Sequence, residues 1–175
     1  MSSWDVEIVA LGPLLAGTLR ELRADLARGL ARPVRIAASP LSLDDAFDPA
    51  RRQYSAQVLL ELLRRRSPPP GLRLLGVTRV DLFLPVFTHV FGAAQLGGPA
   101  AVVSCHRLRG TDVDPGGKAT AGRLLREALH ELGHTAGLIH CRCSWCSMAP
   151  SRTPEEVDLK DAGYCPQCAR RLGMT

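Results

Sequence analysis

Several features that define other protein classes are missing from this chain of 175 residues. No apolar run approaches the roughly 20 residues that a membrane-spanning helix needs, and no segment is repeated. The first residues carry no basic stretch, and Glu7 and Pro13 interrupt the apolar run that follows, so no secretory signal is expected. Residues 11–17 lack both the GxGxxG pattern and a Walker lysine, which argues against a nucleotide-binding turn. We therefore expect a cytoplasmic chain with reduced thiols.

The composition is that of a globular protein. A hydrophobic content of 46% can supply a sizeable core, so we expect one domain over residues 1–175. Its upper part would be residues 1–137, and residues 138–175 would form a C-terminal part. The net charge of +5 is modest and spread along the chain, which makes nucleic acid an unlikely partner. A monomer is favoured.

Hydrophobic periodicity predicts alternating strands and helices. Helical spacing of Leu19, Leu22, Leu26 and Leu30 predicts a helix over residues 14–30, and Val58, Leu59, Leu62 and Leu63 are expected on the inner face of a second helix. Short apolar strands and the helices that separate them predict an α/β sandwich with a mixed sheet. The expected strands are 5–11, 33–38, 72–77, 80–84 and 100–104; the expected helices are 14–30, 53–66 and about 120–135.

The most informative segment is residues 130–140, HELGHTAGLIH, which fits HExxHxxGxxH. Residues four apart share a helix face, so His130 and His134 can offer imidazoles to one ion. Gly137 lets the chain leave the helix and return His140 as a third ligand. Three neutral ligands with one open position are typical of a catalytic zinc, and Glu131 lies beside it as a general base.

The alternative is a helix that carries histidines for structural reasons. Three of the five histidines fall within eleven residues, which that alternative does not explain. His89 and His106 belong to no motif and are expected to be structural histidines.

Five of the six cysteines follow immediately. Cys165 and Cys168 form a CxxC knuckle, and Cys141 and Cys146 form a pair upstream of it. Two cysteine pairs at this spacing predict a tetrahedral zinc site of four thiolates. Cys143 is a spare that could replace a neighbouring ligand.

Disulfides and a redox CxxC are the alternatives to a zinc site. Disulfides are disfavoured in a reducing compartment. A redox CxxC is disfavoured because no strand-to-helix thioredoxin context surrounds Cys165 and Cys168. Cys105 is expected to be a small buried apolar residue.

The combined run from His130 to Cys168 resembles the archaemetzincins, a family of metzincin zinc peptidases. Met148 stands where the methionine turn of metzincins would come. Segments 76–83 and 91–95 are similar to archaemetzincin segments as well, although many relatives carry a polar residue where Ala93 stands. The resemblance implies a metzincin-like core, a C-terminal segment stapled by four cysteines, and two zinc ions per chain, one catalytic and one structural.

The predicted activity is hydrolysis of peptide bonds, with Glu131 as general base and acid. The family layout implies a peptide or protein substrate extended along an edge strand at Gly92, Ala93 and Ala94. The competing hypothesis is a catalytically silent, zinc-stabilised module that binds protein or nucleic acid.

Overall fold

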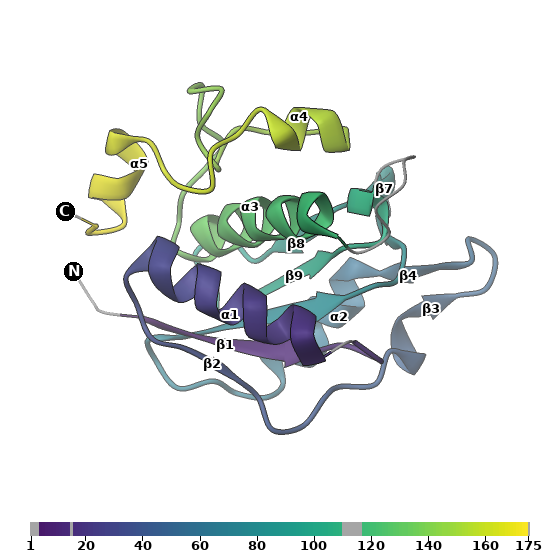
Figure 1. Ribbon diagram of the computed structural model, residues 1–175. Helices are drawn as coiled ribbons and strands as arrows, with labels where there is room; N and C mark the ends of the chain where they lie inside the picture. The colour runs from purple at the N-terminus through teal and green to yellow at the C-terminus, as the bar shows by residue number, and fades with distance from the viewer. Residues whose placement is uncertain (1–3, 15, 110–116, 175) are drawn as a thin grey trace.

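The computed structural model describes residues 4–14, 16–109 and 117–174. A five-stranded sheet lies at its centre (Figure 1). Its strands, in spatial order, are β2 (Val34–Ile36), β1 (Asp5–Ala10), β5 (Leu72–Thr78), β9 (Ala100–Ser104) and β8 (Gly92–Ala94). The first four strands are parallel, whereas β8 pairs antiparallel with β9, so the sheet is mixed as predicted.

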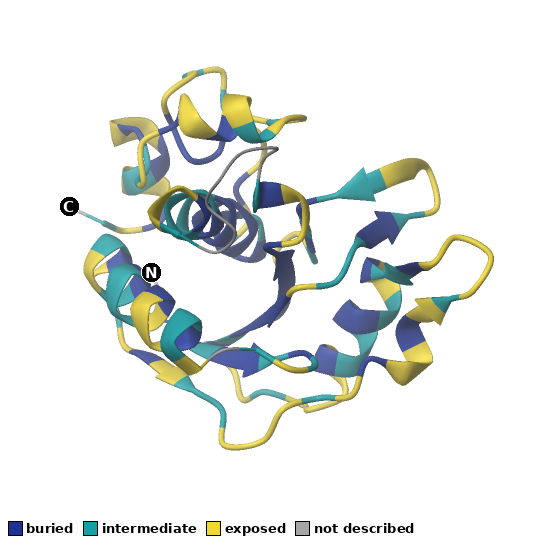
Figure 2. Ribbon diagram, turned by 45° about the vertical axis from the view of Figure 1, so that its right-hand side comes forward, coloured by how far each residue is buried: buried dark blue, intermediate teal, exposed yellow. Residues whose placement is uncertain are grey.

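Helices cover both faces of this sheet. The helices are α1 (Ala16–Leu30), α2 (Ala56–Arg64), α3 (Lys118–Thr135), α4 (Pro154–Asp158) and α5 (Pro166–Arg171). One buried cluster joins α1 and α3 to one face of the sheet, and a second joins α2 to the other face. Strand β9 is buried along its whole length, as expected for a strand with both faces covered (Figure 2).

A smaller sheet flanks the central one. It contains, in spatial order, β3 (Phe47–Asp48), β4 (Gln53–Ser55), β6 (Leu82–Leu84) and β7 (Phe87–Val90). Single-turn 3-10 helices at Asp44–Ala46 and Arg107–Arg109 complete the regular structure of the described residues.

The predicted helix over residues 53–66 is too long at both ends. Residues 53–55 form β4 instead, and the side chain of Ser55 then caps α2 by accepting from the Val58 N–H. The predicted inner face is confirmed in part: Leu59 and Leu63 are buried together with Leu60, whereas Val58 and Leu62 are only partly buried against the same cluster.

The other predicted elements are found with small changes at their ends. Helix α3 begins two residues before the predicted start and ends at Thr135 as predicted. On its inner face Leu124 and Ala128 join Leu129 and Leu132, whereas Leu125 and Ala136 are only partly buried. The first helix is found from Ala16, and Leu15 lies outside the described residues. No helix in the described part of the chain is long and apolar enough to cross a membrane.

The chain after α3 forms an irregular layer over that helix, on the side away from the sheet (Figure 1). Within this layer α4 begins at Thr153, whose hydroxyl accepts from the Glu156 N–H, and Pro154 occupies the first helical turn. The backbone of residues 138–153 contains no helix or strand. This segment brings the cysteines and Met148 against the end of α3 that carries the histidines.

Candidate active site and metal centres

Helix α3 presents two imidazoles whose orientation is fixed by main-chain carbonyls. His130 Nδ1 lies 2.7 Å from the Ser147 carbonyl oxygen, and His134 Nδ1 lies 2.7 Å from the Leu138 carbonyl oxygen. Because a carbonyl only accepts, both Nδ1 atoms carry the proton. The tautomer therefore leaves Nε2 of each ring as a free lone pair, which is the usual arrangement of a metal-ligating histidine.

These two lone pairs face each other. The Nε2 atoms of His130 and His134 are 3.1 Å apart, yet neither carries a proton that could make a hydrogen bond between them. Two unprotonated nitrogens at this distance repel unless a cation lies between them. Two ligands each about 2.0–2.1 Å from one zinc ion fit this spacing.

His140 completes the group from outside the helix. Gly137 adopts a φ of +89°, and the N–H groups of Gly137 and Leu138 return to the carbonyls of His134 and Gly133. This turn brings the His140 ring within 5.2 Å of the His130 ring and 5.1 Å of the His134 ring, centroid to centroid. One nitrogen from each ring lies within 4.8 Å of the others. His140 is exposed while His130 is buried, so the group is open on the His140 side.

Burial keeps two of these histidines neutral. It lowers the pKa of His130 to about 3, with a further contribution from the charge of Lys160. Burial also lowers the pKa of His134, against the opposing hydrogen bond to the Leu138 carbonyl. Both rings therefore stay unprotonated at neutral pH, which is the form that binds a metal.

Glu131 is buried between α3 and the edge strand β8. A Cβ atom built on Gly92 would lie 2.7 Å from Glu131 Oε1, so only glycine leaves room for this carboxylate. Burial and the neighbouring carboxylate of Glu127 raise the pKa of Glu131 well above its ordinary value, and the ammonium of Lys160 opposes them. A raised pKa makes the carboxylate a stronger base.

A second glycine makes room for Met148. A Cβ atom on Gly133 would lie 2.3 Å from the Met148 sulfur, and Met148 itself is fully buried. The methionine thus packs directly on the helix turn between His130 and His134. In the sequence, Gly133 was only one of the variable positions of the motif, and its role appears when the turn is placed.

Four cysteine sulfurs form a second group. The sulfurs of Cys141, Cys146, Cys165 and Cys168 all lie within 4.8 Å of one another. Cys141 Sγ and Cys165 Sγ are 3.8 Å apart, which is too far for a disulfide. It is about the separation of two ligands 2.3 Å from one ion in a tetrahedral site. Cys143 is not a member of the group.

Backbone N–H groups donate hydrogen bonds to two of these sulfurs. Cys141 Sγ accepts from the Cys143 N–H at 3.4 Å, and Cys146 Sγ accepts from Met148 and Cys165 at 3.4 and 3.3 Å. Burial raises the pKa of the Cys165 thiol, but hydrogen bonds from Cys168 and the neighbouring thiols bring it down to about 7. These bonds favour the thiolate form that binds zinc.

The two groups share one turn of the chain. Residues 146–149 form a turn closed by the bond from the Ala149 N–H to the Cys146 carbonyl, at 2.9 Å. Within it the Met148 carbonyl accepts from the Cys141 N–H, and the Ser147 carbonyl accepts from His130. Ser147 was absent from the predicted site, since a contact through its carbonyl leaves no signature in the sequence.

The predicted substrate strand is the edge of the central sheet in the described chain. Ala94 packs with the cluster on the α3 face, and Gly92 lies against Glu131 on the same face. Ala93 belongs to the cluster on the opposite face, beside α2. Its side chain therefore points away from the histidines, and only its backbone is available to a ligand on their side.

The two remaining histidines, His89 and His106, belong to neither group of possible metal ligands in the described residues. The His89 ring packs on Phe91, and its Nδ1 contacts the Thr88 hydroxyl.

Comparison with known proteins agrees with this geometry. The model of peptidase family M54 matches residues 42–174. An archaemetzincin from Haloquadratum walsbyi is 38% identical over 173 residues, covering 95% of this chain and 98% of the relative. One from Methanopyrus kandleri is 40% identical over 129 residues, covering 74% of this chain and 71% of the relative.

Solved structures are similar over the whole chain. The crystal structure of archaemetzincin from Archaeoglobus fulgidus, complexed with malonate, has a TM-score of 0.80 at 33% identity and covers 95% of this chain and 99% of its own. A zinc-dependent peptidase from Methanocorpusculum labreanum has a TM-score of 0.83 at 29% identity, with the same coverage. The fold, the histidine group and these matches together establish that the chain belongs to peptidase family M54, the archaemetzincins, and is a zinc metallopeptidase.

Proposed function

We propose that His130, His134 and His140 hold the catalytic zinc, that Glu131 is the general base and acid, and that the four cysteines hold a second, structural zinc. The observation that carries the first assignment is the pair of unprotonated Nε2 atoms 3.1 Å apart. When bound there, zinc supplies Lewis-acid chemistry, since it polarises the scissile carbonyl and makes a water molecule acidic near neutral pH.

Glu131 supplies the proton transfers. Its carboxylate lies on the helix between the two histidines, next to the edge strand and out of bulk solvent. It would accept a proton from the attacking water and then deliver it to the departing amine nitrogen. Its buried position keeps the proton from exchanging with solvent between the two steps.

Strand β8 would bind the substrate backbone. An extended peptide can add to a free sheet edge through main-chain hydrogen bonds. Gly92 and Ala94 face the side of Glu131, and the missing side chain of Gly92 and the small one of Ala94 let another backbone approach closely. We therefore assign Gly92, Ala93 and Ala94 to substrate binding, with Ala93 acting through its backbone alone.

The second zinc would hold the layer that carries His140 and Met148. The sulfur separation of 3.8 Å and the three N–H donors to the sulfurs support this assignment. Thiolate ligands persist in a reducing compartment, so we place the protein in the cytoplasm.

The decisive experiment combines metal analysis with peptide turnover. We expect two zinc ions per chain and hydrolysis of an unbiased peptide library. Replacement of Glu131 by Gln should reduce kcat by about 10²–10⁴-fold, the usual contribution of acid–base catalysis, while both zinc ions stay bound.

Different failures point to different errors. One zinc ion per chain would remove one of the two metal assignments, and cobalt absorption from thiolate ligands would identify which site remains. Two zinc ions without turnover of any peptide would favour the zinc-stabilised binding module. Full activity of Glu131→Gln would remove the role given to this carboxylate.

A further inference from the structure

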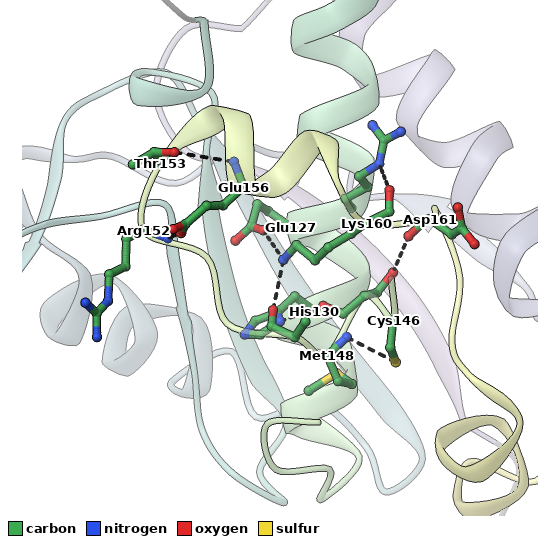
Figure 3. Close-up of polar contacts among 12 residues, drawn as sticks. Glu127, His130, Cys146, Met148, Arg152, Thr153, Glu156, Lys160 and Asp161 are labelled. Carbon is green, nitrogen blue, oxygen red and sulfur yellow. Dashed lines mark hydrogen bonds and ion pairs between the residues drawn. The ribbon is translucent and has the colours of Figure 1, made fainter. Parts of the chain in front are cut away.

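A buried lysine lies beside the active site without being part of it. The chain has only two lysines, Lys118 and Lys160, against twenty arginines. The Lys160 side chain is 1% exposed and pairs with Glu127 of α3, whose side chain is 6% exposed. Its Nζ donates to Glu127 Oε1 at 2.8 Å and to the Ala149 carbonyl at 3.1 Å (Figure 3). A compact ammonium can satisfy both acceptors in this small space.

The carbonyl that Lys160 holds belongs to the turn that orients His130. Ala149 closes the turn of residues 146–149 with its N–H, and two residues earlier the Ser147 carbonyl accepts the His130 Nδ1 proton. Lys160 thus holds one end of the turn, and the turn holds the imidazole. Glu127 lies one helix turn before His130, so the path begins and ends on α3.

The backbone around Lys160 is itself held in place. Arg126 Nε donates to the Lys160 carbonyl at 2.6 Å. The next residue, Asp161, accepts from the Ser147 hydroxyl at 3.0 Å through its carbonyl and donates its N–H to the Trp145 carbonyl at 2.7 Å. The turn is therefore fixed both by the Lys160 side chain and by the backbone that carries it.

We propose that Lys160 is a positioning residue for the catalytic zinc site, acting with Glu127 through the Ala149 and Ser147 carbonyls on His130. This inference rests on the assignment of His130 as a zinc ligand. Partners that orient a metal-ligating histidine typically change metal affinity or activity about 10–100-fold when removed.

A purely structural role for the ion pair makes a different prediction. Removing one partner of a buried pair is strongly destabilising because it leaves a buried charge uncompensated, whereas apolar replacement of both partners is often neutral or stabilising. If Lys160 and Glu127 only held the fold together, zinc affinity would recover whenever stability recovers.

The test uses zinc affinity of the full chain, measured by competition with a chelator, and the thermal midpoint. Lys160→Met should lower the zinc affinity of the histidine site about 10–100-fold, and it should lower kcat more than KM. The double variant Lys160→Met/Glu127→Leu should regain the thermal midpoint but not the zinc affinity. If Lys160→Met alone does not fold, the double variant still provides the measurement of zinc affinity. Cobalt bound to the four cysteines serves as an internal control, because its thiolate absorption should not change.

Asp158→Asn is the matched control. The Asp158 carboxylate accepts from Arg123 Nε and Nη2 at 2.9 and 2.6 Å, so this pair also joins α3 to the C-terminal layer, but it does not contact the turn. Zinc affinity should be unchanged in this variant. Recovery of zinc affinity together with stability in the double variant would overturn the proposal. If the histidines of the unmodified chain bind no zinc, the proposed function itself is overturned.

Discussion

The region that ends with α3 and the segment that follows it are held together by different forces. The first has an apolar core on both faces of the central sheet. In the described part of residues 138–174, the buried apolar residues are only Leu138, Cys146, Met148, Ala149, Val157, Cys165, Cys168 and Leu172. Three of these eight are cysteines of the second metal group. Little apolar surface remains to hold the layer if no metal is bound.

Hydrogen bonds supply part of the stabilisation that the few buried apolar residues of the C-terminal segment do not provide. Tyr164 donates its hydroxyl to the Leu129 carbonyl at 2.7 Å, and Arg32 donates to the Leu172 carbonyl at 2.8 Å. Both bonds join the C-terminal segment to the first region, one at α3 and the other at the loop between α1 and β2. The histidine site lies where the two regions meet. Its geometry therefore depends on hydrophobic packing for α3 and on hydrogen bonds, together with the proposed second zinc, for His140 and the turn that carries Met148.

The largest expected effect comes from removing a cysteine ligand. Cys168→Ser should cost the C-terminal segment much of the stabilisation by a structural zinc, which is on the order of 10 kcal/mol. Limited proteolysis should then cut within residues 138–174 first while the sheet region resists. Simultaneous loss of protection from the protease in both regions would show that they unfold as one cooperative unit and are not stabilised separately.

A core substitution should affect the first region without altering the metal sites. Leu75 is fully buried in the centre of the sheet, and Leu75→Ala should lower the free energy of unfolding by about 2–5 kcal/mol. Zinc affinity of the folded variant should stay unchanged, as measured by chelator competition well below the thermal midpoint. Leu159→Ala is the control, since Leu159 is 74% exposed and its truncation should have almost no effect on stability.

A smaller change at the boundary tests how the regions meet. Gly133→Ala places a Cβ against the buried Met148 sulfur, so the turn of residues 146–149 must shift. We expect a loss of about 1–3 kcal/mol in stability from overpacking, accompanied by a lower kcat. Gly29→Ala in α1 meets only Leu129 Cδ2 at 3.9 Å and should leave activity unchanged. Equal kcat values for both variants would show that displacing Met148 does not affect the zinc site.

The smallest expected effect concerns a helix cap in the C-terminal layer. Thr153→Ala removes the acceptor for the Glu156 N–H and should cost about 1 kcal/mol. If metal binding provides most of the stability of this layer, the rate of hydrogen exchange should increase in α4 alone. Spread of the faster exchange to the cysteines would indicate that the helix supports the metal site.

The sequence predicted secondary-structure elements and the grouping of side chains well where the signal is local. Spacing of four along a helix predicted the convergence of His130 and His134, and continuous apolar residues predicted β9. The inner face of α2 was predicted in part, since Leu59 and Leu63 are buried while Val58 and Leu62 are only partly buried. The pairing of Gln53–Ser55 with β3 and β6 was not predicted, because contacts with other strands leave no local pattern in the sequence.

By itself, the sequence determined how the three histidines converge and how each cysteine pair forms, because helix geometry and short turns fix side chains only a few residues apart. The meeting of Cys141 and Cys165, 24 residues apart, depends on the tertiary structure. Tertiary structure also decided what surrounds these histidines and cysteines. The Ser147 carbonyl reaches His130 across 17 residues, and Lys160 reaches Glu127 across 33. Such contacts depend on how the C-terminal layer packs over α3, and no periodicity in the chain records that packing. The need for glycine at positions 92 and 133 has the same origin, because each makes room for a side chain from another element.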